Sequence, residues 1–336
     1  MEKVIDSPYS DCKAVLNNII KEEEYRKEKF NVYEFFYKCE KTGNEFTTPE
    51  IGDINMFQLY NQYRERKNIL FPDQIKKMRE KYDLSAAKMS EVLGFGANTY
   101  SNYEKGEIPN DSNSTLLNVA NEPDEFKKSI IAKKESLFSK NQLNNLYDTI
   151  DKLIQEKNNC SIYNIIWSRN AVPNKFTGYR TPDFKKFAHT VIYFIREPHT
   201  FVTRLNKYLF YSDFLNFKNT GYSITGLHYA AILRGPVPND YDYLYQLLFS
   251  EEFIDKEDVS INNNDIYERY KPAKEFDESL FTKEELKSLK SVMDKFCFLK
   301  TEEIINLSHE EKAWIENQAK KDLISFQDYA FELKGI

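Results

Sequence analysis

A short polar segment of this chain could recognise DNA through hydrogen bonds. The segment, "ANTYSNYEKG", follows a glycine-bounded turn and carries Asn98, Thr99, Ser101 and Asn102. Asparagine can form a two-bond pair with adenine, and serine or threonine can bond bases or phosphates. Lys105, near the end of the segment, suits a phosphate contact. On pattern alone, a plain helical hairpin with a solvated polar face is an equal alternative.

The acid–base residues form no recognised catalytic set. The four histidines are His189, His199, His228 and His309, and none has a cysteine, carboxylate or second histidine at a known ligand or catalytic spacing. Asp213, inside "LFYSDF", could be a buried acid with a raised pKa, or could bond backbone groups or tyrosine hydroxyls. The sequence lacks a glycine-rich phosphate loop, Gly-x-Ser-x-Gly and His-Glu-x-x-His. We therefore expect no enzyme and no cofactor. A site built from Asp213, His228 and nearby tyrosines is the minor alternative.

The cysteines are scattered, at Cys12, Cys39, Cys160 and Cys297. Two Cys-x-x-Cys knuckles would suit a zinc ribbon, and here the knuckle positions would be "SPYS" (7–10) and "CEKT" (39–42). Three of the four sulfurs are absent there, and hydroxyls are poor zinc ligands. We therefore expect no metal. Cys12 lies off the knuckle spacing and is expected to be an ordinary thiol.

The composition bounds the function class. The chain has 336 residues and a net charge of −6, so any DNA-binding face must be local. No apolar run approaches the roughly 18 residues that span a bilayer, and the N-terminus lacks a secretion pattern. We expect a cytoplasmic protein with reduced thiols and no membrane contact.

The elements that position these residues fall into four predicted segments. In residues 1–53, alternation from Glu22 to Thr48 predicts a small β-meander, which is too small to be stable without support. Residues 54–120 show helical spacing. Pro72 suits a first helical position, Ser85 caps the next helix, and Gly94 allows a positive φ after that helix.

Within residues 54–120, Tyr100 and Tyr103 are three apart and can form the packing stripe of a helix whose other face enters a major groove. The basic residues around this helix are balanced by acidic ones. Few phosphate contacts per subunit are therefore expected, and a homodimer would double them.

Residues 121–175 carry apolar stripes at helical spacing, one of which includes Leu146 and Ile150. Such stripes must be buried, either in a dimerisation helix pair or against a neighbouring domain, and we favour dimerisation. Residues 176–336 are mainly helical, with a short strand predicted in "LHYAAILRGPVP". Capping boxes are predicted at Thr282 with Glu285 and at Ser308 with Glu311, each starting a helix.

Two resemblances give these segments a function. The frame "LSAAKMSEVLGFGANTYSNYEKGEIP" resembles the helix-turn-helix of MqsA-type antitoxins and their Xre/Cro relatives. That family also has an N-terminal zinc ribbon, which in this sequence would be degenerate. By position, the resemblance implies that Asn98, Thr99, Ser101 and Asn102 face the DNA groove.

The second resemblance lies in "LNKYLFYSDFLNFKNTGYSITGLHYAAILRGPVP" and in "LSHEEKAW", which together resemble the Panacea (SocA-like or GepA-like) domain. This resemblance implies an antitoxin that neutralises a protein toxin by direct binding. We expect toxin contact on an exposed surface around Tyr211, Asp213, Arg234, Gly235 and Pro236.

The sequence therefore predicts a multidomain, mainly α protein. It would have a β-ribbon (1–53), a helix-turn-helix (54–120), a helical linker (121–175) and a Panacea domain with minor strands (176–336). The expected function is the antitoxin of a type II toxin–antitoxin pair that binds a cognate toxin and its operator DNA. A phage-associated or chromosomal transcription regulator without a toxin is the alternative.

Overall fold

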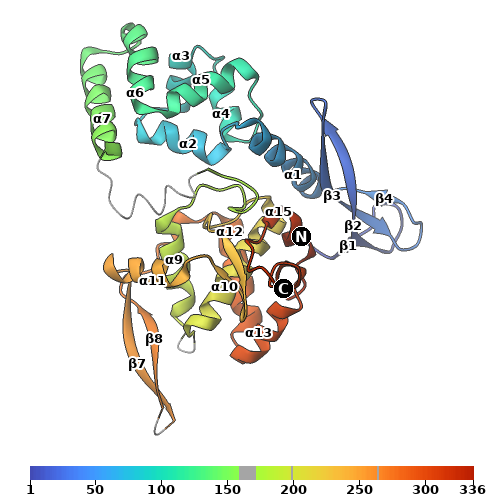
Figure 1. The fold of residues 1–336 in the computed structure, drawn as a ribbon. Helices are drawn as coiled ribbons and strands as arrows, with labels where there is room; N and C mark the ends of the chain where they lie inside the picture. The colour runs from blue at the N-terminus through green and yellow to red at the C-terminus, as the bar shows by residue number, and fades with distance from the viewer. Residues whose placement is uncertain (159–171, 198–199, 263–264) are drawn as a thin grey trace. The chain divides into compact units, whose positions relative to one another are not determined.

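The computed structural model describes residues 1–158, 172–197, 200–262 and 265–336 (Figure 1). It is mainly helical with a small N-terminal sheet, which confirms the predicted class. The described chain forms two compact units, one of Met1–Leu59 with Val172–Ile336 and one of Tyr60–Ala171. The N-terminal sheet is thus grouped with the C-terminal helices, whereas the sequence predicted it as a separate segment. His199 and Cys160 lie outside the described residues.

The first unit begins with an antiparallel sheet of strand order β1-β2-β3-β4. Its strands are β1 (Val4–Asp6), β2 (Lys13–Tyr25), β3 (Glu28–Cys39) and β4 (Glu45–Phe46). The long β2–β3 pairing runs from Ala14 opposite Cys39 to Tyr25 opposite Glu28. Its turn is formed by Arg26 and Lys27, both at positive φ. Glycine and asparagine usually occupy such turns, so no residue preference marked this one in advance.

The sheet is supported by α1 (Pro49–Lys67) and by the C-terminal segment. Asn55 exchanges two hydrogen bonds of 2.9 Å with the backbone of Phe35. Gln58 does the same for Tyr33, at 2.8 and 2.9 Å. The amides thus satisfy the backbone edge of β3 that strand pairing leaves open. The Phe331 ring lies 5.4 Å from that of Phe35 between centroids. These contacts give the small sheet the support that its size requires.

The helices of this unit pack around α10, which is buried along most of its length. The helices are α9 (Phe184–Ile195), α10 (Val202–Thr220), α11 (Tyr241–Ser250), α12 (Lys283–Phe296), α13 (Thr301–His309), α14 (Lys312–Ile315) and α15 (Phe326–Tyr329), with short turns η4 (Glu278–Leu280) and η5 (Ala330–Glu332). The predicted strand is present as a hairpin of β5 (Tyr229–Ile232) and β6 (Gly235–Pro238). A second hairpin, β7 (Ile254–Asn262) with β8 (Asp265–Pro272), was not predicted and extends away from the helices of this unit (Figure 1).

One predicted capping box is confirmed and the other is wrong. Thr282 and Glu285 form the reciprocal bonds of a capping box at the start of α12. Ser308, by contrast, lies in the last turn of α13 and donates its hydroxyl to the carbonyl of Ile305 at 2.7 Å. The cap of α14 is Glu311. The helix containing Ser308 had already begun at Thr301, so the serine bonds backward within it.

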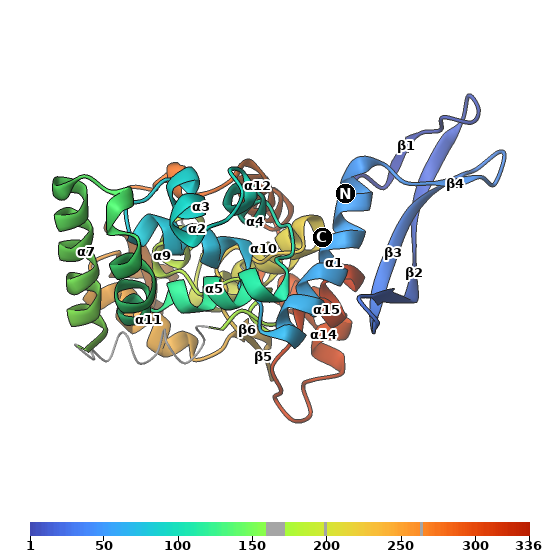
Figure 2. The same ribbon diagram turned by 90° about the horizontal axis from the view of Figure 1, so that it is seen from above.

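The second unit contains the predicted helix-turn-helix. Its elements after α1 are α2 (Pro72–Lys81), α3 (Ala86–Leu93), α4 (Thr99–Glu104), α5 (Asp111–Asn121), α6 (Pro123–Glu125), η1 (Phe126–Ile130), η2 (Ile131–Lys133), η3 (Glu135–Leu137) and α7 (Lys140–Asn158). Figure 2 shows α7 alongside the other helices of this unit. Leu146 and Ile150 of α7 are buried in the same core as Met78, Val92 and Leu117. The apolar stripe of α7 is therefore buried against the neighbouring helix-turn-helix domain, whereas the sequence had led us to favour burial in a dimerisation helix pair.

Candidate nucleic-acid interface and protein-binding surface

The turn between α3 and α4 is built by local backbone chemistry. Ser85 caps α3 by accepting a hydrogen bond of 3.1 Å from the backbone of Lys88, as predicted. Gly94 ends α3 in the left-handed conformation with a φ of 73°. The backbone of Tyr100 then donates to the Ser90 hydroxyl at 3.1 Å. These bonds fix where α4 begins relative to α3.

The two tyrosines of α4 form its buried stripe. Tyr100 is fully buried and donates its hydroxyl to the carbonyl of Ile75 in α2 at 2.7 Å. Tyr103 is also buried, and its hydroxyl accepts a bond of 2.8 Å from Asn113 of α5. The prediction that these side chains form the packing stripe is confirmed. The opposite side of α4 is consequently free to carry polar groups.

The side chains proposed to contact DNA lie on that polar side. Asn98, Asn102 and Lys105 are exposed, and Thr99 and Ser101 are half-buried. Among the described residues, the Asn98 side chain makes no capping hydrogen bond to α4. Exposed amides can bond base edges without breaking an existing contact. Whether these residues bind DNA stays a prediction.

The cations around α4 are largely paired within the unit. Arg79 bonds Glu104 of α4 at 2.6 Å, and Lys88 bonds Glu91 at 2.9 Å. The pairing with Glu104 holds the pKa of Arg79 above its ordinary value. Side chains engaged in this way contribute few phosphate contacts. The structure therefore agrees with the expectation of modest electrostatic affinity per subunit.

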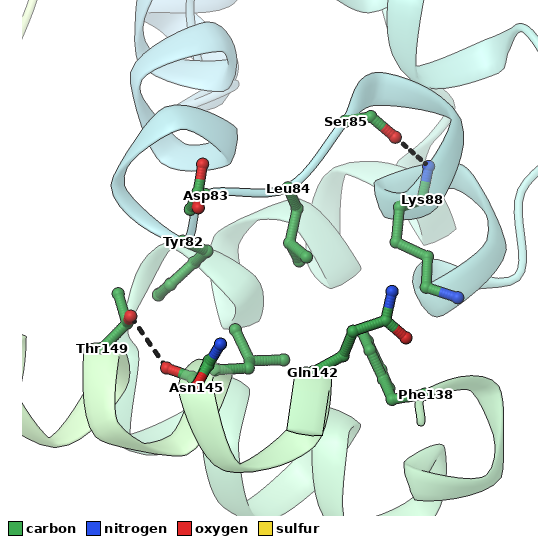
Figure 3. A pocket seen from close by; sticks show the side chains of 10 residues that line it. Tyr82, Asp83, Leu84, Ser85, Lys88, Phe138, Gln142, Asn145 and Thr149 are labelled. Carbon is green, nitrogen blue, oxygen red and sulfur yellow. Dashed lines mark hydrogen bonds between the residues drawn. The ribbon is translucent and has the colours of Figure 1, made fainter. Parts of the chain in front are cut away.

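A cleft of about 410 Å³ lies between the start of α3 and α7 in this unit (Figure 3). Its walls are formed mostly by uncharged side chains, among them Tyr82, Phe138 and Asn145. The lining cation, Lys88, donates to the carbonyl of Leu137 and lies 4.6 Å from the centroid of the Phe138 ring. The lining includes neither histidine nor cysteine, so the described cleft offers no nucleophile or metal ligand of those types.

Asp213 is the centre of a buried hydrogen-bond network in α10. One carboxylate oxygen accepts from the backbone of Ile224 at 2.7 Å and of Thr225 at 2.9 Å. The other accepts from the hydroxyls of Thr225 at 2.5 Å and Tyr229 at 2.7 Å. Burial raises the pKa of Asp213, and these four donors oppose the increase. The carboxylate therefore ties α10 to the loop that leads into β5.

The β5–β6 turn is held by a buried lysine. Lys207 of α10 is 1% exposed and donates to the carbonyl of Pro236 at 2.8 Å. Burial lowers the pKa of Lys207 to about 7. Gly235 has a φ of 92°, and a Cβ there would lie 2.8 Å from the Lys207 ammonium and collide with the Ser308 hydroxyl. Only glycine fits this close approach.

Glu311 holds the C-terminal segment against α10. Its carboxylate accepts from the backbone of Lys334 at 3.0 Å and of Gly335 at 2.7 Å. It also accepts from the hydroxyl of Tyr211 at 3.2 Å. Both side chains are buried, and burial raises the pKa of Glu311. The two segments that suggested the family resemblance thus meet in the interior of the unit.

The five residues expected to bind the toxin therefore do not form one exposed surface. Tyr211, Asp213, Gly235 and Pro236 are buried, and only Arg234 is exposed. The expectation of exposure was wrong for these four residues because each fills a contact in the interior. The neighbouring Leu233 is 83% exposed, and no feature of the sequence had marked it. On α14, Ile315 is 51% exposed, next to Trp314, whose indole donates to the carbonyl of Ile232 in β5.

The knuckle positions of the N-terminal sheet come together, although most of their sulfurs are absent. The Ser10 hydroxyl lies 3.3 Å from the Cys39 sulfur, and the Thr42 backbone lies 3.5 Å from it. Cys12, expected to be an ordinary thiol apart from these positions, lies 3.4 Å from Cys39 between sulfurs. Both are free cysteines, and the β1–β2 loop, which folds back over the end of β3, brings their sulfurs together. Among the described residues, no group of three or more His, Cys, Asp or Glu side chains could hold a metal ion.

Comparison with known families assigns two of these regions. Residues 75–118 match the family described as helix-turn-helix. Residues 205–315 match the family described as antitoxin SocA-like, Panacea domain. A search of curated proteins found no match. The chain thus contains a helix-turn-helix domain and a SocA-like Panacea domain, and the likeness of residues 1–53 to a degenerate zinc ribbon stays a prediction. None of the described helices is long and apolar enough to cross a membrane.

Proposed function

We propose that this chain is the antitoxin of a type II toxin–antitoxin pair. Its Panacea domain would bind and neutralise a cognate protein toxin. Its helix-turn-helix would bind the operator of its own operon, so that repression depends on the amount of toxin bound. The observation that carries the proposal is the presence of both domains in one chain. The proposal assigns no reaction to the chain.

On the Panacea domain, we propose the outer side of the β5–β6 hairpin as the toxin-binding surface. Leu233 and Arg234 are exposed at its turn, and Ile315 is exposed on the adjoining α14. Two hydrogen bonds fix the strands on either side of the turn, from Lys207 to the Pro236 carbonyl and from Trp314 to the Ile232 carbonyl. An exposed leucine and arginine on a rigid turn can bind a partner with little loss of conformational freedom. Tyr211, Asp213, Gly235 and Pro236 would support this surface without touching the toxin.

On the DNA-binding domain, we propose that Asn98, Thr99, Ser101 and Asn102 contact bases and that Lys105 contacts a phosphate. The motif that carries them is short, and its nearby cations are paired. A homodimer on a two-fold operator would double the contacts and supply the affinity that one copy lacks. Sedimentation of the full chain with and without operator DNA tests this stoichiometry.

The test of the toxin partner is co-expression with the neighbouring gene. We expect a neighbour that stops growth alone, is tolerated with this chain, and copurifies with it. Arg234→Glu should weaken copurification about tenfold or more. The matched charge reversal Lys283→Glu, at an exposed position in the first turn of α12, should have no effect. A harmless neighbour that forms no complex would contradict the antitoxin proposal.

A transcription regulator without a toxin is the second candidate, because the helix-turn-helix match is independent of the Panacea match. It would bind the operator with the same affinity whether or not the neighbouring gene product is present. An antitoxin, in contrast, should show operator binding that changes with the amount of toxin. Titration of operator binding at increasing neighbour concentration separates the two.

A further inference from the structure

The sulfurs of Cys12 and Cys39 meet at one end of the N-terminal sheet. They lie 3.4 Å apart. Cys39 is the last residue of β3 and lies opposite Ala14 of β2. The loop before β2 is fixed by its own backbone, since Ser7 donates to the Cys12 carbonyl at 2.9 Å and Cys12 donates to the Ser10 carbonyl at 2.8 Å. The two thiols are thus held close together by secondary structure, although they are far apart in sequence.

The surroundings of Cys39 stabilise its charged form. The hydroxyl of Ser10, together with those of Ser7 and Thr42, lowers the pKa of Cys39 to about 5. The sulfur of Cys39 would therefore be a thiolate at neutral pH, which is the form that attacks an oxidised sulfur. The two cysteines also differ in solvent exposure, because Cys39 is 1% exposed whereas Cys12 is half-buried.

We propose that Cys12 and Cys39 are a redox modification site that closes to a disulfide when a peroxide oxidises the chain. The more exposed Cys12 sulfur takes one oxygen atom from hydrogen peroxide, becomes a sulfenic acid and releases water. The Cys39 thiolate then attacks the Cys12 sulfur. The sulfur–sulfur bond forms and hydroxide leaves, taking up a proton to become water. In total, two thiols and one peroxide give one disulfide and two waters.

A disulfide fits this geometry better than a metal ion does. Zinc in a structural site takes four ligands, mostly sulfur and nitrogen, at about 2.0–2.3 Å. Here, within the part of the chain that the structure describes, the two sulfurs are accompanied by hydroxyl and backbone groups and by no further sulfur or histidine nitrogen. A disulfide needs two sulfurs and no further ligand, and the sulfurs would approach from 3.4 Å to about 2.05 Å. The bond would link the β1–β2 loop to β3 without disturbing the β2–β3 pairing.

The site is tested on the purified full chain by titration with hydrogen peroxide, followed by peptide mapping. The expected product has two fewer reactive thiols and one cross-linked peptide pair that contains Cys12 and Cys39. Dithiothreitol should reverse the change completely. The oxidised chain should also resist proteolysis between residues 7 and 12 several-fold better than the reduced chain. Cys12→Ser and Cys39→Ser should each abolish the cross-link, whereas Cys297→Ser, half-buried in the segment after α12, should leave it unchanged.

Three outcomes would overturn the proposal. One is over-oxidation of Cys12 to sulfinic acid with no cross-link, since it would show that Cys39 does not reach the oxidised sulfur. Another is a cross-link from either residue to Cys160 or Cys297 in place of this pair. The third is a zinc or copper ion that copurifies in equal amount with the chain, blocks oxidation, and is lost in both serine variants. None of these results depends on toxin or operator binding, so the proposed function is tested separately.

Discussion

At the scale of single residues, Asp213 shows how a motif residue can matter without contacting a partner. Four donors converge on its carboxylate, and two of them are backbone groups of the loop before β5. Buried donors that lose their acceptor cost about 1–3 kcal/mol each when no water replaces it. We therefore expect Asp213→Ala to lower the free energy of unfolding by roughly 3 kcal/mol or more.

Denaturant unfolding of the full chain measures the effect of Asp213→Ala. Asp242→Ala, at an exposed position in the first turn of α11, is the control and should change stability by less than about 0.5 kcal/mol. A variant at Asp213 that unfolds like the wild type would show that the network is not structural. In that case, the enzymatic alternative around Asp213 and His228 would gain support.

Lys207 gives a second prediction at this scale, because its charge is buried and it donates to the carbonyl of Pro236. Its pKa is about 7 in the folded chain and near 10.5 when unfolded. Between these values the unfolded state binds more protons, so stability rises with pH from about 7 toward 10. Below pH 7 both states are protonated, and the cost of burying the charge is fully present. We expect the Tm to rise by a few degrees between pH 7 and 9.

The variant Lys207→Met isolates this contribution. It cannot titrate, so the rise in its Tm over the same range should be smaller than that of the wild type. Other groups also titrate in this pH range, such as the Met1 amino group, whose pKa is lowered by burial. These groups are the same in both proteins and therefore contribute equally to both Tm curves. Parallel Tm curves for the two proteins would mean that Lys207 is not the source of the pH dependence.

The sequence marked Asp213 as a candidate buried carboxylate or as a partner of backbone groups and tyrosine hydroxyls, but it did not mark Lys207. Several polar side chains of α10 are buried, among them Arg204, Lys207, Asp213 and Asn216. Because polar residues usually mark the solvent-exposed face of a helix, the sequence did not indicate that this face packs inward. What satisfies these groups lies far along the chain, for instance the Pro236 carbonyl for Lys207 and the Leu299 carbonyl for Arg204. Periodicity reports local amphipathicity and contains no information on such distant partners.

At the scale of elements, α4 carries the DNA prediction. Asn102 is exposed on the face opposite Tyr100 and Tyr103. Loss of one good base contact costs about 1–3 kcal/mol, so Asn102→Ala should weaken operator binding roughly tenfold at fixed salt. Its Tm should stay unchanged because the side chain is solvated. Asn144→Ala, exposed on α7, is the matched control for operator binding.

A contrasting variant in the same helix separates binding from folding. Tyr100→Phe removes the bond to the Ile75 carbonyl and leaves a buried acceptor, which should cost about 1 kcal/mol of stability or more. Its operator affinity, measured well below its Tm, should change little. If Asn102→Ala lowers the Tm as much as Tyr100→Phe does, the polar face of α4 is structural and the DNA prediction fails.

Elements with local signals were predicted better than elements that depend on context. The Ser85 cap, the Gly94 helix end and the Thr282 capping box are each formed by residues within a few positions of one another. The turn at Arg26 and Lys27 has no such residue preference, since the long β2–β3 pairing imposes its positive φ values. Ser308 resembled a cap because its helix was predicted to begin eight positions after its true start at Thr301.

At the scale of the whole molecule, the order of N-terminal sheet, helix-turn-helix and Panacea domain is confirmed. The grouping of the sheet with the C-terminal helices depends on contacts between residues far apart in the sequence. Tyr33 of β3 donates to Glu332 at 2.7 Å, and the Met1 amino group donates to Asn219 at 2.6 Å. Gln327 donates to Gln58 at 3.2 Å. These polar contacts are specific to the folded chain and leave no periodic trace in the sequence. A fragment of residues 176–336 alone would therefore lose the contacts that the N-terminal residues make with it.

The grouping into two units predicts two thermal transitions, because each unit has its own apolar core. Met78 is 1% exposed in the core of the second unit, and Phe331 is 3% exposed between the sheet and helices of the first. Truncating a buried methionine or phenylalanine to alanine costs about 2–5 kcal/mol. Each variant should therefore lower one calorimetric transition by several degrees and leave the other in place. If Met78→Ala and Phe331→Ala instead lower a single common transition, the two units unfold together, and toxin binding to one would stabilise the other.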